Sequence, residues 1–333
     1  MAKKPSLFLF PEKRGEDNMR DYVRYIAKRI LMMIPILLIV SFLIFFLLRI
    51  TNIDEAAIII GERQSTPEVR ARVIQEYGLD QPKLLQYFDW LRGVVTGNFG
   101  IDYTSGQDVG ELISSRIPVT LGLVLISSVL GMVFAIILGV IAALHRNKPI
   151  DTAISLFMLF FSSVPSFLVS IFVLIILVQF VPGYSFVGSF SNTAEFFQRI
   201  SVPAFIMALG HLALLGRVTR SSMTSQLQSP YIVTAKAKGI PDRQITYKHA
   251  FHNAVIPVLT VAGMSFASAI GGTVLIEQIF SLPGIGGLLI SAVQAHNFPV
   301  VQILVMFMLL VYLVMSLVVD IMYVIVDPRV KLK

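Results

Sequence analysis

Residues that can bind or release a proton are scarce in the apolar parts of this 333-residue chain. His211, Glu277 and Asp320 fall within or beside its long hydrophobic runs. Ionisable groups within membrane spans are typical of proton relays and ion-coupled carriers. Because the runs are otherwise almost bare of such groups, we interpret Glu277 and Asp320 as residues at the boundaries of spans. For His211 we favour a hydrogen-bonded structural role.

The sequence carries no motif for an energy source or a catalytic metal. A GxxxxGK[ST] phosphate-binding loop and an HExxH zinc motif are both missing, and there is no cysteine. The missing cysteine excludes disulfides, thiolate metal sites and cysteine nucleophiles. We therefore expect no catalytic residue, no metal ligand and no cofactor in this chain. Any energy for its activity would have to come from a partner.

The most polar stretch inside the apolar part is residues 231–257, YIVTAKAKGIPDRQITYKHAFHNAVIP, with four Lys/Arg, two His and one acid. Its first part predicts a short helix that ends at Gly239, and Pro241 and Asp242 then start a second helix. Small side chains at Ala235 and Ala237 would let another surface approach closely. We interpret the stretch as a docking element for a partner. The alternative is an ordinary basic cytoplasmic loop.

The elements that position this stretch are membrane spans. Hydrophobic residues make up 55% of the chain and charged residues only 14%, against about 25% charged in soluble domains. The net charge of +7 then reflects basic cytoplasmic loops, and we expect no nucleic acid partner. Six segments are long enough to cross a bilayer: residues 30–50, 118–144, 152–181, 200–216, 254–276 and 298–319. Pro165 should kink or unwind the third of these spans, residues 152–181.

Lysine and arginine alternate between the connections as the positive-inside rule requires. The N-terminal lead holds eight, residues 145–148 two, residues 217–253 six and the C-terminal tail three, whereas residues 277–299 hold none. This predicts an all-α multi-pass protein with both termini in the cytoplasm and an uncleaved first span. The expected units are residues 1–29 (cytoplasmic), 30–50 (first span), 51–115 (extracytoplasmic), 116–326 (core, with a coupling loop at 217–253) and 327–333 (cytoplasmic tail).

Two further regions are predicted from their helix-capping and helix-breaking residues. In the extracytoplasmic segment, Thr66 is a candidate N-cap, Pro67 suits a first helical turn and Gly78 a helix stop, so a small helical cap is expected. The candidates for an outer gate or pathway are Pro165 in SSVPSF, whose serine hydroxyls could satisfy freed carbonyls, and Pro283, Gly284 and Gly286 in SLPGIGG. The alternatives are a packing kink and a plain interfacial turn.

Several motifs in order resemble one family. YIVTAKAKG with KHAFHNAVIP resembles the cytoplasmic coupling loop of ABC-importer permeases, in the dipeptide, oligopeptide and nickel branch, and more closely its first permease subunit. The same branch is matched, nearly along the whole chain beyond residue 19, by GLDQP with GNFG, by RIPVTLGL, by FSLPGIGGLL, by FPVVQ and by VDPRV.

Some positions depart from that resemblance. Val233, Thr234 and Ala235 stand where the general importer loop has Glu-Ala-Ala, and Pro230 stands where an acid commonly precedes the tyrosine. His296 and Asn297 replace a common Arg-Asp pair, which removes charge near the expected substrate entrance.

The resemblance implies a type I ABC-importer permease fold in the bacterial cytoplasmic membrane. A second homologous permease would complete the pathway, two ATPase subunits would carry ATP and Mg²⁺, and an extracytoplasmic lipoprotein would deliver a peptide. The residues that the resemblance assigns to the ATPase-coupling loop are Tyr231, Thr234, Ala235, Lys236, Ala237, Lys238, Gly239, His249, Asn253 and Pro257.

Three other functions stay open from the sequence. A permease for nickel or another small solute is an alternative of the same class, although spans without histidine or acid clusters argue against specific metal ligands. A stand-alone carrier or channel and a membrane scaffold are alternatives of different classes.

Overall fold

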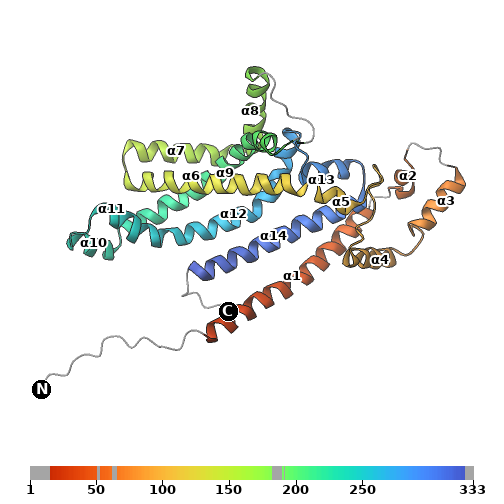
Figure 1. Cartoon of the computed structure of the whole chain (residues 1–333), viewed down its shortest axis with the longest axis horizontal. Helices are drawn as coiled ribbons and strands as arrows, with labels where there is room; N and C mark the ends of the chain where they lie inside the picture. Colours follow the sequence, from red (N-terminus) through yellow and green to blue (C-terminus); the bar gives the residue numbers. More distant parts are fainter. Residues whose placement is uncertain (1–15, 51–52, 62–65, 182–189, 191, 327–333) are drawn as a thin grey trace.

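In the computed structural model the regular structure of the described residues is helical (Figure 1). The structure describes residues 16–50, 53–61, 66–181, 190 and 192–326, with side chains described from residue 24 to 321 apart from those gaps. The expected cytoplasmic tail and most of VDPRV lie outside these residues, as does most of the N-terminal lead. The helices are α1 (Glu16–Ile50), α2 (Glu55–Ile60), α3 (Pro67–Glu76), α4 (Lys83–Thr96), α5 (Val109–Ser114), α6 (Ile117–Leu144), α7 (Pro149–Ser163), α8 (Ser166–Phe180), α9 (Thr193–Leu227), α10 (Pro230–Ala237), α11 (Asp242–Gln244), the π-helix η1 (Ile245–Ala250), α12 (Phe251–Ile279), α13 (Ile285–Gln294) and α14 (Phe298–Val326).

The long helices run along a common direction, so the loops collect at two ends (Figure 1). The helices α10 and α11 lie at one end, and α2 to α5 form a cap at the other. Within the described part of the chain, five helical segments are long and apolar enough to cross a membrane, and a bent pair is a candidate sixth span. They are Arg24–Ile50, Val109–Leu144, Thr193–Leu227, Asp242–Ile279 and Phe298–Ile321, with α7 and α8 as the bent pair.

The third expected span is broken rather than continuous. The helices α7 and α8 meet at an angle of 96°, and α8 projects away from the bundle (Figure 1). Val164 is extended, because the ring of Pro165 disfavours helical geometry in the residue before it, and Pro165 then precedes the new helix. The predicted disruption at Pro165 is confirmed, and the bent pair of α7 and α8 is the candidate for the third span.

The serines before this break do not satisfy the carbonyls that it frees. The hydroxyls of Ser162 and Ser163 donate instead to the carbonyl of Leu159, at 3.0 and 2.9 Å. A cavity of about 340 Å³ lies in the elbow between α7, α8 and α9.

The helix that contains the fourth expected span is longer than residues 200–216. The helix α9 covers 35 residues, so residues 217–227 continue the helix instead of forming a loop. Its His211 lies against Gly131 of α6, and its ring makes no hydrogen bond to another described residue. The histidine is therefore packed rather than hydrogen-bonded as expected.

Small residues allow α6 and α9 to pack closely. A Cβ added at Gly131 would lie 2.9 Å from the carbonyl oxygen of Ala208, and one at Gly139 would lie 2.5 Å from Cβ of Thr219. Gly131, Ala135 and Gly139 recur every fourth residue, so they share one face of α6. Close backbone approach at small residues is the usual way in which membrane helices associate.

Replacing Gly139 by alanine is therefore expected to destabilise the bundle, by about 1–3 kcal/mol, because the new methyl group meets Thr219 and the backbone of Gly216. Gly210, on α9, is a matched control, because an added Cβ there has no neighbour within 4 Å. Thermal unfolding of both alanine variants in detergent checks this. Equal midpoints for the two variants would contradict the close packing of α6 on α9.

The cap formed by α2 to α5 follows the predicted capping residues. Thr66 accepts a hydrogen bond from the amide of Val69 at 3.3 Å, and Pro67 is the first residue of α3. Gly78 has φ of +60° just after α3 ends, a conformation that glycine adopts without strain. The predicted helix start and stop are confirmed, and α4 begins after Pro82 as a separate helix.

Candidate functional site

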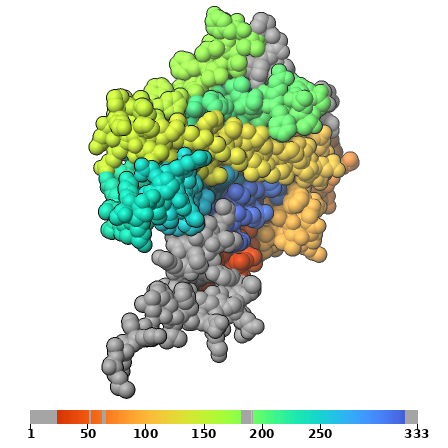
Figure 2. Space-filling view, turned by 60° about the vertical axis from the view of Figure 1, so that its left-hand side comes forward, coloured from red at the N-terminus to blue at the C-terminus, as the bar shows by residue number. Residues whose placement is uncertain are grey.

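The basic stretch forms a short helix, a turn and a second helix at the end of the bundle opposite the cap (Figure 1). The helix α10 spans Pro230–Ala237, and the π-helix η1 leads into α12. Gly239 has φ of +74°, and its amide donates to the carbonyl of Lys236 at 2.9 Å. The predicted helix–turn–helix is confirmed. Figure 2 shows this segment at the surface of the bundle, beside the end of α7.

One face of α10 packs on the chain itself. Ile232 is 1% exposed and Ala235 is 8% exposed, and both join a cluster with Met223, Ile245 and Ala254. These neighbours come from α9, η1 and α12, so α10 is fixed to three other helices. Ala235 consequently cannot offer a small surface to a partner as the sequence suggested. Ala237 is exposed and can.

The opposite face of α10 is open. Val233 is 64% exposed, and Thr234, Lys236, Lys238 and Gly239 are also exposed. An added Cβ at Gly239 would meet nothing within 4 Å. The exposed face thus combines an aliphatic side chain with two lysines on a rigidly held helix, which suits an acidic or mixed protein groove.

Tyr231 ties the two arms of this segment together. Its hydroxyl donates to Oε1 of Gln226 at 2.9 Å and accepts from Nδ2 of Asn253 at 3.2 Å. Asn253 also donates to the carbonyl of His249 at 3.2 Å. The structure therefore brings Tyr231, His249 and Asn253 together, with His249 contributing its backbone carbonyl. Pro257 does not join them, because it lies further along α12, on an exposed face.

A partly buried ion pair that the sequence did not indicate links helices at the same end of the bundle. Asp151 on α7 is 3% exposed and accepts from Nε and Nη2 of Arg220 on α9, at 2.5 and 2.7 Å. It also accepts from the amide of Asn147 at 3.0 Å. The bidentate pair links α7 to the helix that leads into α10, so a force on α10 reaches the bundle through packed helices. Sequence separation concealed the pair, because its residues lie 69 positions apart.

One face of α12 is exposed at its middle and combines small and polar side chains with two large apolar ones, Met264 and Leu275. Added Cβ atoms at Gly271 and Gly272 would meet nothing within 4 Å. The exposed face of α1, in contrast, carries large aliphatic residues. A cavity of about 730 Å³ lies beside this face between α9, α12 and α14. The exposed residues of the α12 face are Met264, Ser268, Gly271, Gly272, Leu275 and Gln278.

The gate candidates that follow α12 in the chain, Pro283, Gly284 and Gly286, lie in a packed interior turn. Gly284 and Gly286 are buried, and the carboxylate of Glu277 accepts from Thr120 Oγ1 at 2.6 Å and from the amides of Gly286 and Gly287 at 2.7 and 3.1 Å. Glu277 lies in the last turn of α12, two residues from its end, so its position near a span boundary agrees with the interpretation from the sequence. It is 0% exposed and fixes the start of α13 to α6 and α12. Pro283 is half-buried in the same turn.

Asp320 pairs with another transmembrane helix. Its Oδ2 lies 2.8 Å from Nη2 of Arg29, so the pair joins α14 to α1. Asn297, where the resemblance has an acid, donates its amide to the carboxylate of Asp102. An acid at 297 would face a second carboxylate there, which explains why an amide fits this site.

The fold defines a multi-pass helical membrane protein with an exposed, rigidly held segment at α10. Residues 135–332 match the family of binding-protein-dependent transport system inner membrane components, and residues 22–124 match its N-terminal part. The chain belongs to this family of inner-membrane proteins, which are the permease components of ABC transporters and not their catalytic subunits. The resemblance stated from the motifs is confirmed.

Relatives match over nearly the whole chain. A putative peptide transport system permease protein of Brucella abortus is 38% identical over 92% of this chain and 98% of its own. The oligopeptide transport system permease protein AppB of Bacillus subtilis is 35% identical over 92% and 99%. The glutathione transport system permease protein GsiC of Shigella flexneri is 32% identical over 93% and 100%. The fold is shared with the crystal structure of an amino acid ABC transporter with histidines, at a TM-score of 0.50 and 16% identity, over 66% of this chain and 95% of that one.

Proposed function

We propose that the chain is one of two permease subunits of a peptide importer and that α10 transmits the movement of a partner ATPase. The observation that carries this is the construction of α10. Its inner face is fixed by Ile232 and Ala235 to three helices, while its outer face with Val233 and Lys236 is open. A partner that moves α10 would move α9 and α12 with it, and through them the bundle.

The exposed face of α12 supports a second permease subunit. Membrane helices use small residues where another helix approaches closely, and Gly271 and Gly272 stand in open space on this face. We place the translocation pathway between this face, including Ser268, and the second permease. The basic connections, including the α10 segment, support a cytoplasmic location for that end of the bundle. The cap then lies outside, where the binding lipoprotein delivers its cargo.

ATP and Mg²⁺ belong to the two ATPase subunits in this proposal. Nucleotide binds two states of the assembly with different affinity, so its binding and hydrolysis shift the population between outward-facing and inward-facing pathways. This chain contributes no group to the chemistry of hydrolysis. It supplies the helix α10, which transmits movement from the ATPase, and one side of the translocation pathway.

Short peptides are the proposed cargo. The relatives named for peptide, oligopeptide and glutathione transport support this class. The half-open α12 face with Ser268 and Gln278 offers hydrogen-bonding groups but no charged side chain, which suits a peptide backbone. Nickel or another small solute remains the alternative cargo of the same machine. A stand-alone carrier and a scaffold are disfavoured by family membership.

The test is to isolate the chain from its native membrane with its partners and to measure ATP hydrolysis with added peptide. Co-purification of two ATPases, a second permease and a binding protein, with hydrolysis raised by peptide, is expected. If hydrolysis by the same complex rises with nickel and not with peptide, the proposed cargo is wrong and nickel takes its place. A chain that purifies alone and supports no hydrolysis would overturn the importer proposal.

A further inference from the structure

A polar cavity of about 440 Å³ lies within the cap, away from α10 and from the exposed face of α12. It is bounded by the end of α1, by α3 and α4, by residues 98–103 and by the first turns of α14. Ligand sites for small molecules are typically 300–1,000 Å³ and combine apolar walls with a few polar groups. Residues that line it include Arg49, Glu55, Tyr77, Trp90, Tyr103 and Gln302.

Two side chains of the wall bring unused hydrogen-bonding groups to this cavity. Gln302 is 0% exposed, and neither its Nε2 nor its Oε1 bonds to any other described residue. The indole Nε1 of Trp90 is likewise buried and without a partner among the described residues. Buried polar groups in folded proteins are normally hydrogen-bonded. The amide of Gln302 and the indole N–H of Trp90 are therefore available to form hydrogen bonds with a polar ligand in the cavity.

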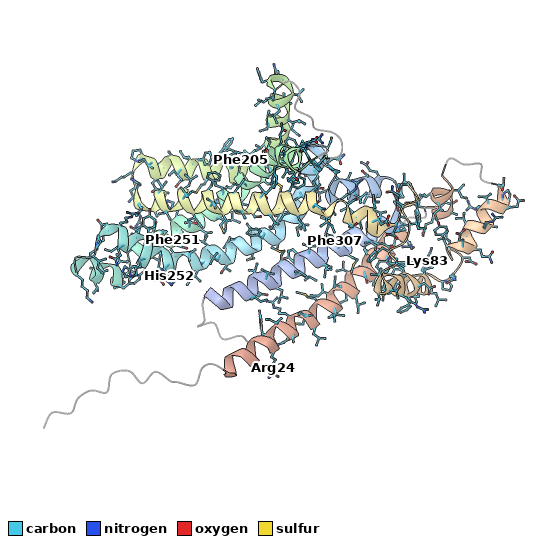
Figure 3. The ribbon with its side chains drawn as sticks, in the orientation of Figure 1. Arg24, Lys83, Phe205, Phe251, His252 and Phe307 are labelled. Carbon is cyan, nitrogen blue, oxygen red and sulfur yellow. The ribbon has the colours of Figure 1, made fainter. Side chains whose placement is uncertain are left out.

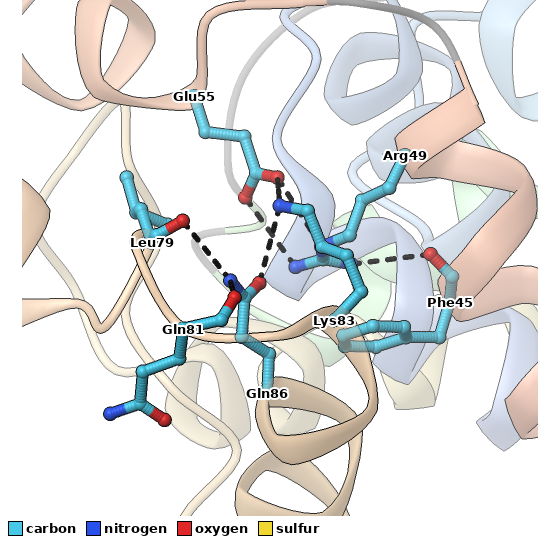
Figure 4. A network of polar contacts seen from close by, with 7 residues as sticks. All are labelled: Phe45, Arg49, Glu55, Leu79, Gln81, Lys83 and Gln86. Atoms are coloured by element: carbon cyan, nitrogen blue, oxygen red, sulfur yellow. Dashed lines mark hydrogen bonds and ion pairs between the residues drawn. The ribbon is translucent and has the colours of Figure 1, made fainter.

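The positive and negative side chains around the cavity differ in whether they have a partner. Arg49 is occupied: its Nε lies 3.3 Å from Oε1 of Glu55, and its Nη1 donates to the carbonyl of Phe45 (Figure 4). Lys83 also approaches Glu55, at 3.6 Å. The remaining carboxylates of the wall, Glu76 and Asp89, form no ion pair with another described residue and are exposed. The free charge at the wall is thus negative.

The aromatic part of the wall adds a further hydroxyl. The rings of Tyr77 and Tyr103 meet edge to face, with centroids 6.1 Å apart. Burial raises the pKa of the Tyr103 phenol above its ordinary value, so this hydroxyl stays protonated at neutral pH and can donate as well as accept. The wall thus combines the largely buried Arg49–Glu55 ion pair and two exposed carboxylates with neutral hydrogen-bonding groups.

We propose that this cavity binds the amino end of a short peptide on the outer side of the permease, an inference that rests on the peptide cargo proposed above. The amide of Gln302 matches a peptide amide, because each offers one donor group and one acceptor. The indole of Trp90 donates to a peptide carbonyl. Glu76 and Asp89 attract the terminal ammonium. The cap would thereby hold a peptide close to the point where α1 and α14 enter the membrane.

Trp90 makes the site measurable, because it is the only tryptophan in the chain. The full chain in detergent is titrated with trialanine and with N-acetyltrialanine while indole emission is followed. We expect a saturable change with trialanine and weaker binding of the acetylated peptide, since acetylation removes the ammonium. Gln302→Leu should raise the Kd for trialanine about tenfold or more. Gln294→Leu, on the exposed surface of α13 and outside the cavity, should leave it unchanged.

Asp89→Asn serves as the second variant, because its exposed side chain can change without loss of folding. It should reduce the preference for trialanine over the acetylated peptide. No saturable change in the wild-type chain, or equal Kd values for Gln302→Leu and Gln294→Leu, would overturn the proposal. If the assembled transporter then still hydrolyses ATP in response to peptide, this site alone fails. If the cavity binds trialanine but the assembly ignores peptide, the cargo proposal fails instead.

Discussion

Replacing Gly239 by proline is expected to abolish peptide-stimulated ATP hydrolysis in the assembled transporter while the chain still inserts into the membrane. Gly239 has φ of +74°, whereas proline is fixed near −65°. Proline would also remove the amide that donates to the carbonyl of Lys236. The turn after α10 could not form, so the exposed face with Val233 and Lys236 would lose its fixed direction. Hydrolysis by reconstituted complexes with added peptide measures the effect.

Two other substitutions at the same residue separate backbone geometry from side-chain bulk. An added Cβ at 239 meets nothing within 4 Å, so size alone should matter little. Asparagine tolerates the left-handed conformation and should retain most coupling. Alanine should lie between, because a left-handed alanine costs about 1 kcal/mol. Normal coupling in Gly239→Pro would refute the role assigned to α10. Equal losses in all three variants would point to side-chain exclusion instead of the turn.

The second large effect is expected at Gly284. An added Cβ there would lie 2.3 Å from Cδ and Oε2 of Glu277, which is far inside van der Waals contact. Gly284→Ala would push the carboxylate away from the amides of Gly286 and Gly287 and leave these buried donors unpaired. We expect a loss of about 2–5 kcal/mol in the free energy of unfolding, from overpacking and broken hydrogen bonds together. Chemical unfolding in detergent, followed by Trp90 emission, measures it.

A double-mutant cycle tests the cause of that loss. Glu277→Ala is destabilising by itself, because Thr120 and the two glycine amides lose their acceptor. In that background Gly284→Ala should cost much less, because the three nearest neighbours of the new Cβ are atoms of Glu277. Gly271→Ala, at an open position of α12, is the control. Additive effects of the two substitutions would exclude the clash as the mechanism.

The opposite ends of the bundle show why some predictions succeeded. Figure 3 places Phe251 and His252 at the α10 end, Lys83 at the cap and Arg24 near the start of α1. Hydrophobic length and the placement of Lys and Arg determined this separation, because a span must be apolar and a connection must stay in water. Turn chemistry determined the stops at Gly78 and Gly239, since both have positive φ and glycine is the residue that adopts it freely.

Tertiary structure alone decided which residues meet across the bundle. Glu277 was interpreted as a boundary residue because its charge follows an apolar run, and it does lie in the last turn of α12. The sequence did not reveal that the groups donating hydrogen bonds to its carboxylate come from α6 and from the start of α13. Asp151 and Arg220 pair across 69 positions, and Gln302 reaches the cap cavity with Trp90. Ala235 faces its own core because the rotation of α10 is set by the packing of Ile232. The sequence by itself determined local conformation and hydrophobic length, which depend on neighbours along the chain. Contacts between distant segments depend on how whole helices pack, so only the folded bundle decided them.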